Sequence, residues 1–227
     1  DVKLPLDAEQ MQILLRFLRS SLMDSDQHNP AIGLVKAIVA RRYLSAEVYD
    51  VVETLLELTV RSHKASLRDQ SRSIVVSFLI EYPLEPGRLK EILDQIALNL
   101  RYEIADGRLS AITLVASVID RFPIKALVDH CEVFFLPLSI QLVNDDSDDC
   151  KRAVSKCITA LLKRLPLESI QELHSFTERW EEGASLQVMV LQLHGHFIDN
   201  EEFMKRTKDV SSMLDKLETT MQECENN

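Results

Sequence analysis

Apolar residues recur at helical spacing in residues 145–167. The stretch opens with an acidic turn, in which Ser147 or Asp149 can cap free backbone N–H groups. The residues that follow place apolar side chains three and four positions apart, which aligns them on one face of a predicted helix that ends at Pro166. That face consists of Ala153, Val154, Cys157, Ile158, Leu161, Leu162 and Leu165.

The same pattern precedes two earlier prolines, Pro83 and Pro123. The residue eight positions before each of the three prolines is apolar: Val75, Val115 and Ile158. A fourth copy lacks the proline and has Tyr43 in its place. The steps from position 43 through the prolines at 83, 123 and 166 are therefore 40, 40 and 43 residues. Such steps are typical of HEAT and armadillo repeats, in which each unit is a pair or triplet of helices.

These repeats predict an all-α fold, an α-solenoid of about five HEAT/armadillo-like helix pairs plus a C-terminal helix. One unit cannot bury its own apolar face, so neighbouring units must stack. The alternative is an ordinary bundle of unrelated amphipathic helices, and four copies in phase favour the solenoid. We expect residues 1–227 to form a single solenoid segment of a longer protein. Residues 201–221 would cap its end or dock on a partner, and residues 222–227 would be a frayed tail.

The predicted helices follow from apolar spacing, caps and breakers. They cover residues 7–22, a partner helix after Asn29-Pro30, then 45–61, 66–81, 86–102, 105–122, 124–143, the helix of 145–167, 167–181, 184–199 and 201–221. Pro137 lies inside the 124–143 run, where it removes a backbone donor. We expect it to kink or split that helix.

Composition agrees with a folded helical chain. Apolar residues make up 46% and charged residues 27%, and there are only 5 glycines. The apolar runs are shorter than the ~20 residues that a membrane span needs, so no membrane contact is expected. The chain begins with Asp1 rather than Met and looks like a piece of a longer polypeptide.

The net charge of −10 does not indicate a bulk electrostatic attraction to nucleic acid, although local basic surfaces can exist. The four cysteines, at positions 131, 150, 157 and 224, show no CxxC spacing. Free thiols of this kind fit a reducing intracellular compartment.

The sequence shows no catalytic signature. His194 and His196 are two residues apart, so on a helix they point to different faces and cannot share a metal. The acidic run at 145–149 lacks the glycine and the glutamate of a calcium loop, and the scattered glycines form no phosphate-binding loop. We therefore expect no enzyme activity, no metal and no cofactor.

The basic residues are the candidate binding site. Fifteen positions before the three prolines stand Arg68, Arg108 and Lys151, and Arg72 and Arg152 lie nearby. In a regular stack these side chains would form a ladder that could contact RNA phosphates or another partner. The alternative is that each basic residue pairs with a turn acid, such as Asp69, Asp106 or Asp149, in its own or the adjoining repeat.

Two blocks of the sequence resemble a known family. They are VVSFLIEYPLEPGRLKEILDQIALNLRYEIADGRLSAI at 75–112 and FFLPLSIQLVNDDSDDCKRAVSKCITALLKRL at 134–165, together about a third of the chain. The motifs SFLIEYPL, YE-x-x-x-GRLSAI and FFLPL-x-x-x-LVNDDS are similar to those of component 20 of the small-subunit processome, the DRIM family of large helical-repeat scaffolds.

The resemblance implies a non-enzymatic scaffold of the nucleolus (nucleus). Such a protein acts in early small-subunit ribosome biogenesis, in the processing of the 18S precursor RNA. Its implied partners are proteins of the pre-ribosomal particle and pre-rRNA or small nucleolar RNA, with no small-molecule substrate. The alternative is another HEAT-repeat interaction protein, such as a nuclear transport receptor.

Overall fold

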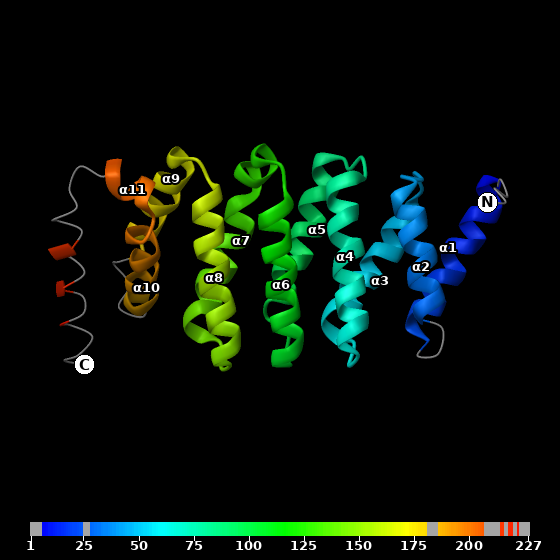
Figure 1. Cartoon of the computed structure of the whole chain (residues 1–227), viewed down its shortest axis with the longest axis horizontal. Helices are drawn as coiled ribbons and strands as arrows, with labels where there is room; N and C mark the ends of the chain where they lie inside the picture. The colour runs from blue at the N-terminus through cyan, green and yellow to red at the C-terminus, as the bar shows by residue number, and fades with distance from the viewer. Residues whose placement is uncertain are drawn as a thin grey trace. The chain divides into compact units, whose positions relative to one another are not determined.

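The computed structural model describes residues 6–24, 28–180 and 186–206, together with 214, 215, 218, 219 and 222. The described residues form α-helices joined by short turns, and they include no strand, which confirms the all-α prediction (Figure 1). The chain divides into two compact units, residues 1–114 and 115–227. The long helix α6 begins in the first unit and ends in the second.

The first unit contains two helix pairs and a fifth helix that precedes α6. The helices are α1 (Ala8–Met23), α2 (His28–Ala40), α3 (Ala46–Arg61), α4 (Ala65–Glu81), α5 (Pro86–Asn99) and α6 (Ala105–Arg121). Within each pair the helices contact each other, α1 with α2 and α3 with α4. Between pairs, α1 packs on α3 and α2 packs on α4. Equivalent helices of successive pairs are therefore neighbours.

The second unit continues the chain order. Its helices are α7 (Ile124–Asn144), α8 (Asp148–Arg164), α9 (Leu167–Glu178), α10 (Gln187–Ile198) and α11 (Glu201–Arg206). Helix α7 packs on α8, and α10 contacts α7, α8, α9 and α11. Residues 181, 184, 185, 207–213, 216, 217, 220 and 221 of the predicted C-terminal helices, and most of the tail at 222–227, lie outside the described residues.

The apolar positions predicted from the repeat pattern form the core. The residues eight positions before the prolines, Val75, Val115 and Ile158, are fully buried. The predicted face of α8 is confirmed for Val154, Cys157, Ile158, Leu161, Leu162 and Leu165, which are all buried, whereas Ala153 is only half-buried. The helices α4, α6 and α8 each end two residues before their proline. This is the expected position, since proline restricts the residue before it to an extended backbone.

Some side chains donate hydrogen bonds to backbone carbonyls that lie about one repeat earlier in the chain. The Tyr82 hydroxyl donates to the Tyr43 carbonyl at 2.8 Å, across 39 residues. The Arg164 guanidinium donates to the Phe122 carbonyl at 2.8 Å, across 42 residues, and also to the Ile119 carbonyl. The Asn200 amide donates to the Leu162 carbonyl at 3.1 Å, across 38 residues. The Ile119, Phe122 and Leu162 carbonyls lie at the ends of α6 and α8, where acceptors lack intrahelical partners. The Tyr43 carbonyl lies in the turn between α2 and α3.

Pro137 does not split its helix, contrary to one of the two outcomes expected from the sequence. Helix α7 runs through it for 21 residues. Its neighbours Phe134, Phe135 and Leu138 are buried, and this packing holds the helix together despite the lost backbone donor. Proline costs a helix interior about 3 kcal/mol, a cost that tertiary burial of several large side chains can offset.

Helix α7 also corrects the expectation that the apolar runs are too short for a membrane span. Among the described residues it has the length and apolar composition of one, with a mean hydropathy of 1.4 in its most apolar window. Several of its large side chains, including Leu127, Phe134 and Phe135, are buried inside the protein, whereas Ile124 and Leu136 are exposed. This burial is what a core helix requires, so α7 serves as core in this structure.

Gly107 allows the start of α6 to approach its neighbours closely. A Cβ at this position would lie 2.6 Å from the Val60 carbonyl and would overlap the Tyr102 ring. The ring could move, but the carbonyl is backbone and cannot yield without shifting α3. Gly33, inside α2, has no atom within 4 Å of the equivalent point.

We predict that Gly107→Ala lowers the free energy of unfolding by about 1–3 kcal/mol, because the added methyl group overpacks the contact between α6 and the Val60 carbonyl of α3. The matched change Gly33→Ala should raise it by up to about 1 kcal/mol, since alanine favours a helix interior over glycine. Urea denaturation of the two variants beside the parent protein checks both signs. Equal effects of the two changes would contradict the close approach at Gly107.

Candidate interaction surfaces

Arg68 and Arg108, which share a repeat position, also share a structural role. Each lies in the first turn of its helix, and its guanidinium reaches back to the turn before that helix. Arg68 donates to the Ser62 carbonyl at 2.8 Å. Arg108 donates to the Tyr102 and Glu103 carbonyls at 3.0 and 2.8 Å. Cations suit this position, because carbonyls at a helix end carry partial negative charge.

Arg68 and Arg72 also bridge to the next repeat. The Arg68 guanidinium lies 3.6 Å from the Asp106 carboxylate, and the Arg72 guanidinium donates to the Ser110 hydroxyl, 38 residues further on. Arg72 pairs in addition with Asp69 on its own helix. Only 14% and 17% of the Arg68 and Arg72 side chains are exposed, and Arg108 is buried. These three arginines stabilise the turns and joints between helices.

Lys151 and Arg152 differ from these arginines. Arg152 is 66% exposed, and its ion pair among the described residues is with Asp149 on its own helix. Lys151 is half-buried, and the structure shows no ion pair between it and a described residue. Of the five predicted ladder residues, these two form the fewest side-chain interactions with other described residues of the protein. The pairing of Arg68, Arg72 and Arg152 with Asp106, Asp69 and Asp149 matches the alternative drawn from the sequence, and a contact with phosphate stays a prediction.

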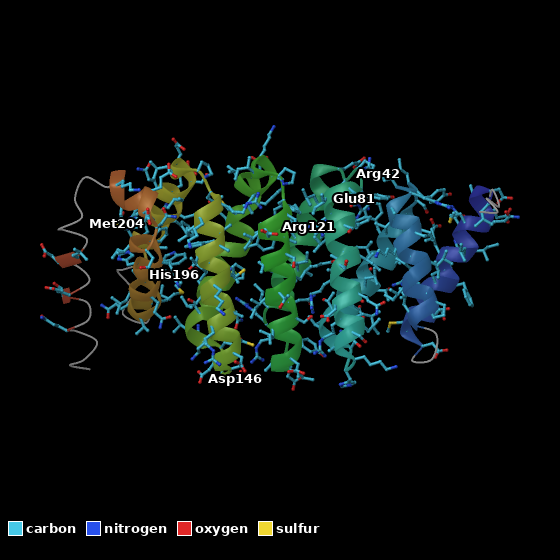
Figure 2. The ribbon with its side chains drawn as sticks, viewed as in Figure 1. Arg42, Glu81, Arg121, Asp146, His196 and Met204 are labelled. Carbon is cyan, nitrogen blue, oxygen red and sulfur yellow. The ribbon has the colours of Figure 1, made fainter. Side chains whose placement is uncertain are left out.

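The two histidines of α10 face different neighbours, as their spacing predicts. The His194 ring stacks on His174 of α9, with ring centroids 5.2 Å apart. His196 is labelled on α10 in Figure 2. Its ring faces α8, where Nδ1 lies 3.0 Å from the Thr159 hydroxyl and Nε2 lies 3.5 Å from the Ser155 hydroxyl. Burial lowers the pKa of His196, and Asp199 partly offsets this effect. Both rings therefore contribute to packing between helices.

The cysteines described by the structure are packing residues. Cys131, Cys150 and Cys157 are free thiols and are buried. Burial raises the pKa of Cys157 to about 12, and burial together with Glu132 raises that of Cys131. Because the thiolate is the reactive species, these two thiols are unreactive at neutral pH. Within the described part of the chain, no three histidine, cysteine or carboxylate side chains gather as a metal site.

In two surface grooves, each of about 510 Å³, most of the charged lining residues are carboxylates. One lies between α3 and α5, and its charged residues are Asp50, Glu53, Arg88 and Glu91. The other lies between α7 and α9, and its charged residues are Glu132, Glu168, Glu172 and Arg179. Carboxylates repel phosphate, so these grooves suit cationic protein segments better than RNA.

Sequence reasoning missed most partners of the basic residues. Asp106 was among the turn acids expected to pair, but Ser110, which lies one repeat beyond Arg72, was not identified. The carbonyl partners at Ser62, Tyr102 and Glu103 carry no sequence signal, because every residue has a carbonyl. The sequence analysis also did not identify Arg164 and Asn200 as donors to carbonyls at the ends of α6 and α8.

Comparison with curated proteins supports the resemblance seen in the sequence. U3 small nucleolar RNA-associated protein 20 of Schizosaccharomyces pombe is 26% identical over 186 residues, which are 80% of this chain and 8% of that protein. The protein of the same name from Saccharomyces cerevisiae is 29% identical over 159 residues, which are 70% of this chain and 6% of that protein. This chain is similar to a segment of U3 small nucleolar RNA-associated protein 20.

The resemblance proposed from the two sequence blocks is thereby confirmed. The chain spans less than a tenth of the length of these relatives. No protein-family model matches it. A crystal structure of an engineered protein overlaps 92% of this chain and 95% of its own, at 12% identity and a TM-score of 0.43. That likeness is too loose to support a statement about the fold.

We predict that Arg108→Ala lowers the free energy of unfolding by about 1–3 kcal/mol, because it removes the buried guanidinium that donates to the Tyr102 and Glu103 carbonyls. The matched change Arg152→Ala should stay within about 0.5 kcal/mol, since an exposed pair on one helix contributes little. Thermal and urea unfolding of both variants check this. A parent-like Arg108→Ala protein would free this arginine for binding and contradict its structural role.

The lowered pKa of His196 predicts a loss of stability in acid. The fold favours the neutral ring, so its contribution is present above the ordinary pKa of about 6.5 and is lost as the pH falls through the lower folded-state pKa. Acidification from pH 7 to 5 should therefore destabilise the parent protein more than a His196→Gln variant. Unfolding in urea at both pH values measures the difference. The exposed His63, changed to glutamine, is the control and should retain the parent's pH dependence.

Proposed function

We propose that this chain is a segment of a non-enzymatic helical-repeat scaffold that acts in early small-subunit ribosome biogenesis. The observation that carries the proposal is its similarity, over most of its length, to U3 small nucleolar RNA-associated protein 20 of two yeasts. On this proposal the chain works in the nucleolus, in the processing of the 18S precursor RNA. It contacts proteins of the pre-ribosomal particle and pre-rRNA or small nucleolar RNA.

The proposed architecture is an α-solenoid of about five HEAT/armadillo-like helix pairs plus a C-terminal helix, forming a single segment over residues 1–227. Two features support it. The proline-ended helices recur every 40 to 43 residues. Within each unit, polar bonds also join residues 38 to 42 positions apart, as they do for Tyr82 with Tyr43 and for Asn200 with Leu162. Both observations are what successive stacked units require.

The charges favour protein partners over RNA for most of the described surface. Arg68, Arg72 and Arg108 bind the chain's own carbonyls, carboxylates and hydroxyl, while the two grooves are rimmed by acids. Lys151 and Arg152 are the ladder positions best placed for a phosphate, because Arg152 is exposed and Lys151 is unpaired within the described residues. A scaffold that holds several partners at once gains affinity from modest contacts through tethering.

The proposal is tested in cells that carry the natural protein with a tag. We expect the tagged protein to sediment with early pre-ribosomal particles and to co-purify U3 small nucleolar RNA and 18S precursor RNA. Ultraviolet crosslinking with nuclease trimming then separates direct RNA contact from contact through proteins. Absence of both RNAs from the purified protein would contradict the proposal. Binding to the GTP form of Ran would instead assign a transport receptor.

Changing Lys151 and Arg152 together to glutamate tests the RNA part of the proposal. If these residues contact phosphates, crosslinking of RNA to this segment falls while sedimentation with the particle persists. The control is the pair Arg88→Glu and Lys90→Glu on α5, which changes the net charge equally at exposed positions away from the ladder. Equal RNA crosslinking by both variants and the parent would exclude phosphate contact at Lys151 and Arg152.

A further inference from the structure

The groove between α3 and α5 has an apolar floor. Val52, Leu56 and Ile92 line it and are themselves buried, and the half-buried Tyr49 also lines it. Its volume is about 510 Å³, which is in the range of pockets that hold ligands. Both helices belong to the first unit, so the groove is formed within one compact body.

Tyr49 is held in a defined orientation at this groove. Its ring stands at right angles to those of Phe78 and Tyr82, with centroids 5.9 and 6.0 Å away. The Arg88 guanidinium of α5 lies 5.6 Å from the centroid of the Tyr49 ring. This contact is favourable because the face of an aromatic ring attracts cations. The groove therefore already contains a position at which a cation is held over an aromatic ring.

Most of the charged residues that line the groove are acidic. The one lining arginine, Arg88, is paired with Glu91 at 2.8 Å. Asp50 lies 3.8 Å from Arg19 of α1. Glu53 is exposed, and the structure shows no ion pair between it and a described residue. Its carboxylate is thus available to a cation from a partner.

An exposed leucine extends the apolar surface of α5. Leu98 is 68% exposed. It follows the lining residues Glu91 and Gln95 by seven and three positions, so all three share one face of α5. Along α3 the lining residues run from Ala46 to Leu56, a length of about 15 Å at a rise of about 1.5 Å per residue. An extended segment of about five residues covers that length.

We propose that the groove between α3 and α5 binds a short extended protein segment in which a lysine or arginine stands next to apolar side chains. The cation of the segment pairs with Glu53 and competes with Arg88 for the Tyr49 ring, while its apolar side chains contact Leu98. RNA fits this groove poorly, because the lining carboxylates repel phosphate. The inference deepens the proposed function and rests on it in one respect, that the chain is a scaffold with protein partners.

Selection from a phage-displayed library of random seven-residue peptides tests the inference on the purified 227-residue chain. We expect the enriched peptides to combine lysine or arginine with neighbouring apolar residues. The most enriched peptide is then synthesised with a fluorescein label, and fluorescence anisotropy at constant salt measures its Kd for the parent and for each variant. Circular dichroism melting confirms that each variant folds. Enrichment of no peptide, or of acidic peptides, would overturn the inference.

Two variants test the acidic and the apolar parts of the groove. Glu53→Lys should weaken binding at least about tenfold, because it sets a like charge against the cation of the peptide. Asp129→Lys on α7 is the matched control, since it makes the same charge change at an exposed position outside the groove. Leu98→Gln should weaken binding about threefold or more through lost apolar contact. Its control is Ile124→Gln at an exposed apolar position on α7.

Arg88→Ala separates a role in binding from a loss of folding. Removal of this guanidinium uncovers the Tyr49 ring and leaves Glu91 to the peptide, so binding should strengthen by about three- to tenfold. A misfolded variant would not bind the peptide more tightly than the parent. Weaker binding by Arg88→Ala, or equal Kd values for the parent and Glu53→Lys, would overturn the inference.

Two other occupants of the groove would give different results. Ultraviolet crosslinking of a labelled oligouridylate to α3 or α5 would assign the groove to RNA and overturn the inference. A dimer of the parent chain in sedimentation that Glu53→Lys abolishes would assign the groove to a second copy, with the same consequence. All these measurements use the purified chain and none depends on association with pre-ribosomal particles, so failure here is distinguishable from failure of the proposed function.

Discussion

The structure depends on burial of apolar stripes that no helix pair can bury alone. The helices α4, α6 and α8 each present an apolar side chain eight residues before their proline, and these side chains are fully buried. Fully burying a Val or Ile side chain contributes about 1.5–3 kcal/mol, so each such position is a substantial share of a domain's net stability. Because the stripe recurs at a fixed step, burial in one pair creates the same requirement for the next.

Hydrophobic burial is not directional, so it does not by itself fix how one pair registers on another. The polar bonds supply that information. Tyr82 donates to the carbonyl of Tyr43 in the turn between α2 and α3, and Arg164 and Asn200 donate to carbonyls at the ends of α6 and α8; these bonds span 38 to 45 residues. A shift of one helical turn would break these bonds and leave buried acceptors unpaired, at a cost of about 1–3 kcal/mol each. Apolar spacing thus sets the length of the repeat, and a few side-chain hydrogen bonds fix how one helix pair registers on the next.

Much of this architecture was predictable because it depends on local pattern. The breaks at Pro83, Pro123 and Pro166 and the apolar face of α8 follow from spacing and from proline's backbone, and both are confirmed. The continuation of α7 through Pro137 was not predictable, because the stability of this helix depends on burial of Phe134 and Phe135 among other helices. Gly107 looked like one scattered glycine, since the nearness of the Val60 carbonyl is a tertiary fact. The recurring basic positions were found by register, but Arg68 and Arg108 donate to the carbonyls of Ser62, Tyr102 and Glu103, which no residue letter reveals.

Several arginines donate to groups within the protein, and this determines how their contribution to stability responds to ionic strength. Arg108 is buried, and its bonds to the Tyr102 and Glu103 carbonyls are short-range and poorly reached by counterions. Added salt should therefore leave the folding contribution of these guanidinium groups almost unchanged. Contacts with phosphate weaken steeply as salt rises. Salt concentration thus separates the two uses of positive charge in this chain: what persists at high salt belongs to the fold, and what is lost belongs to a partner.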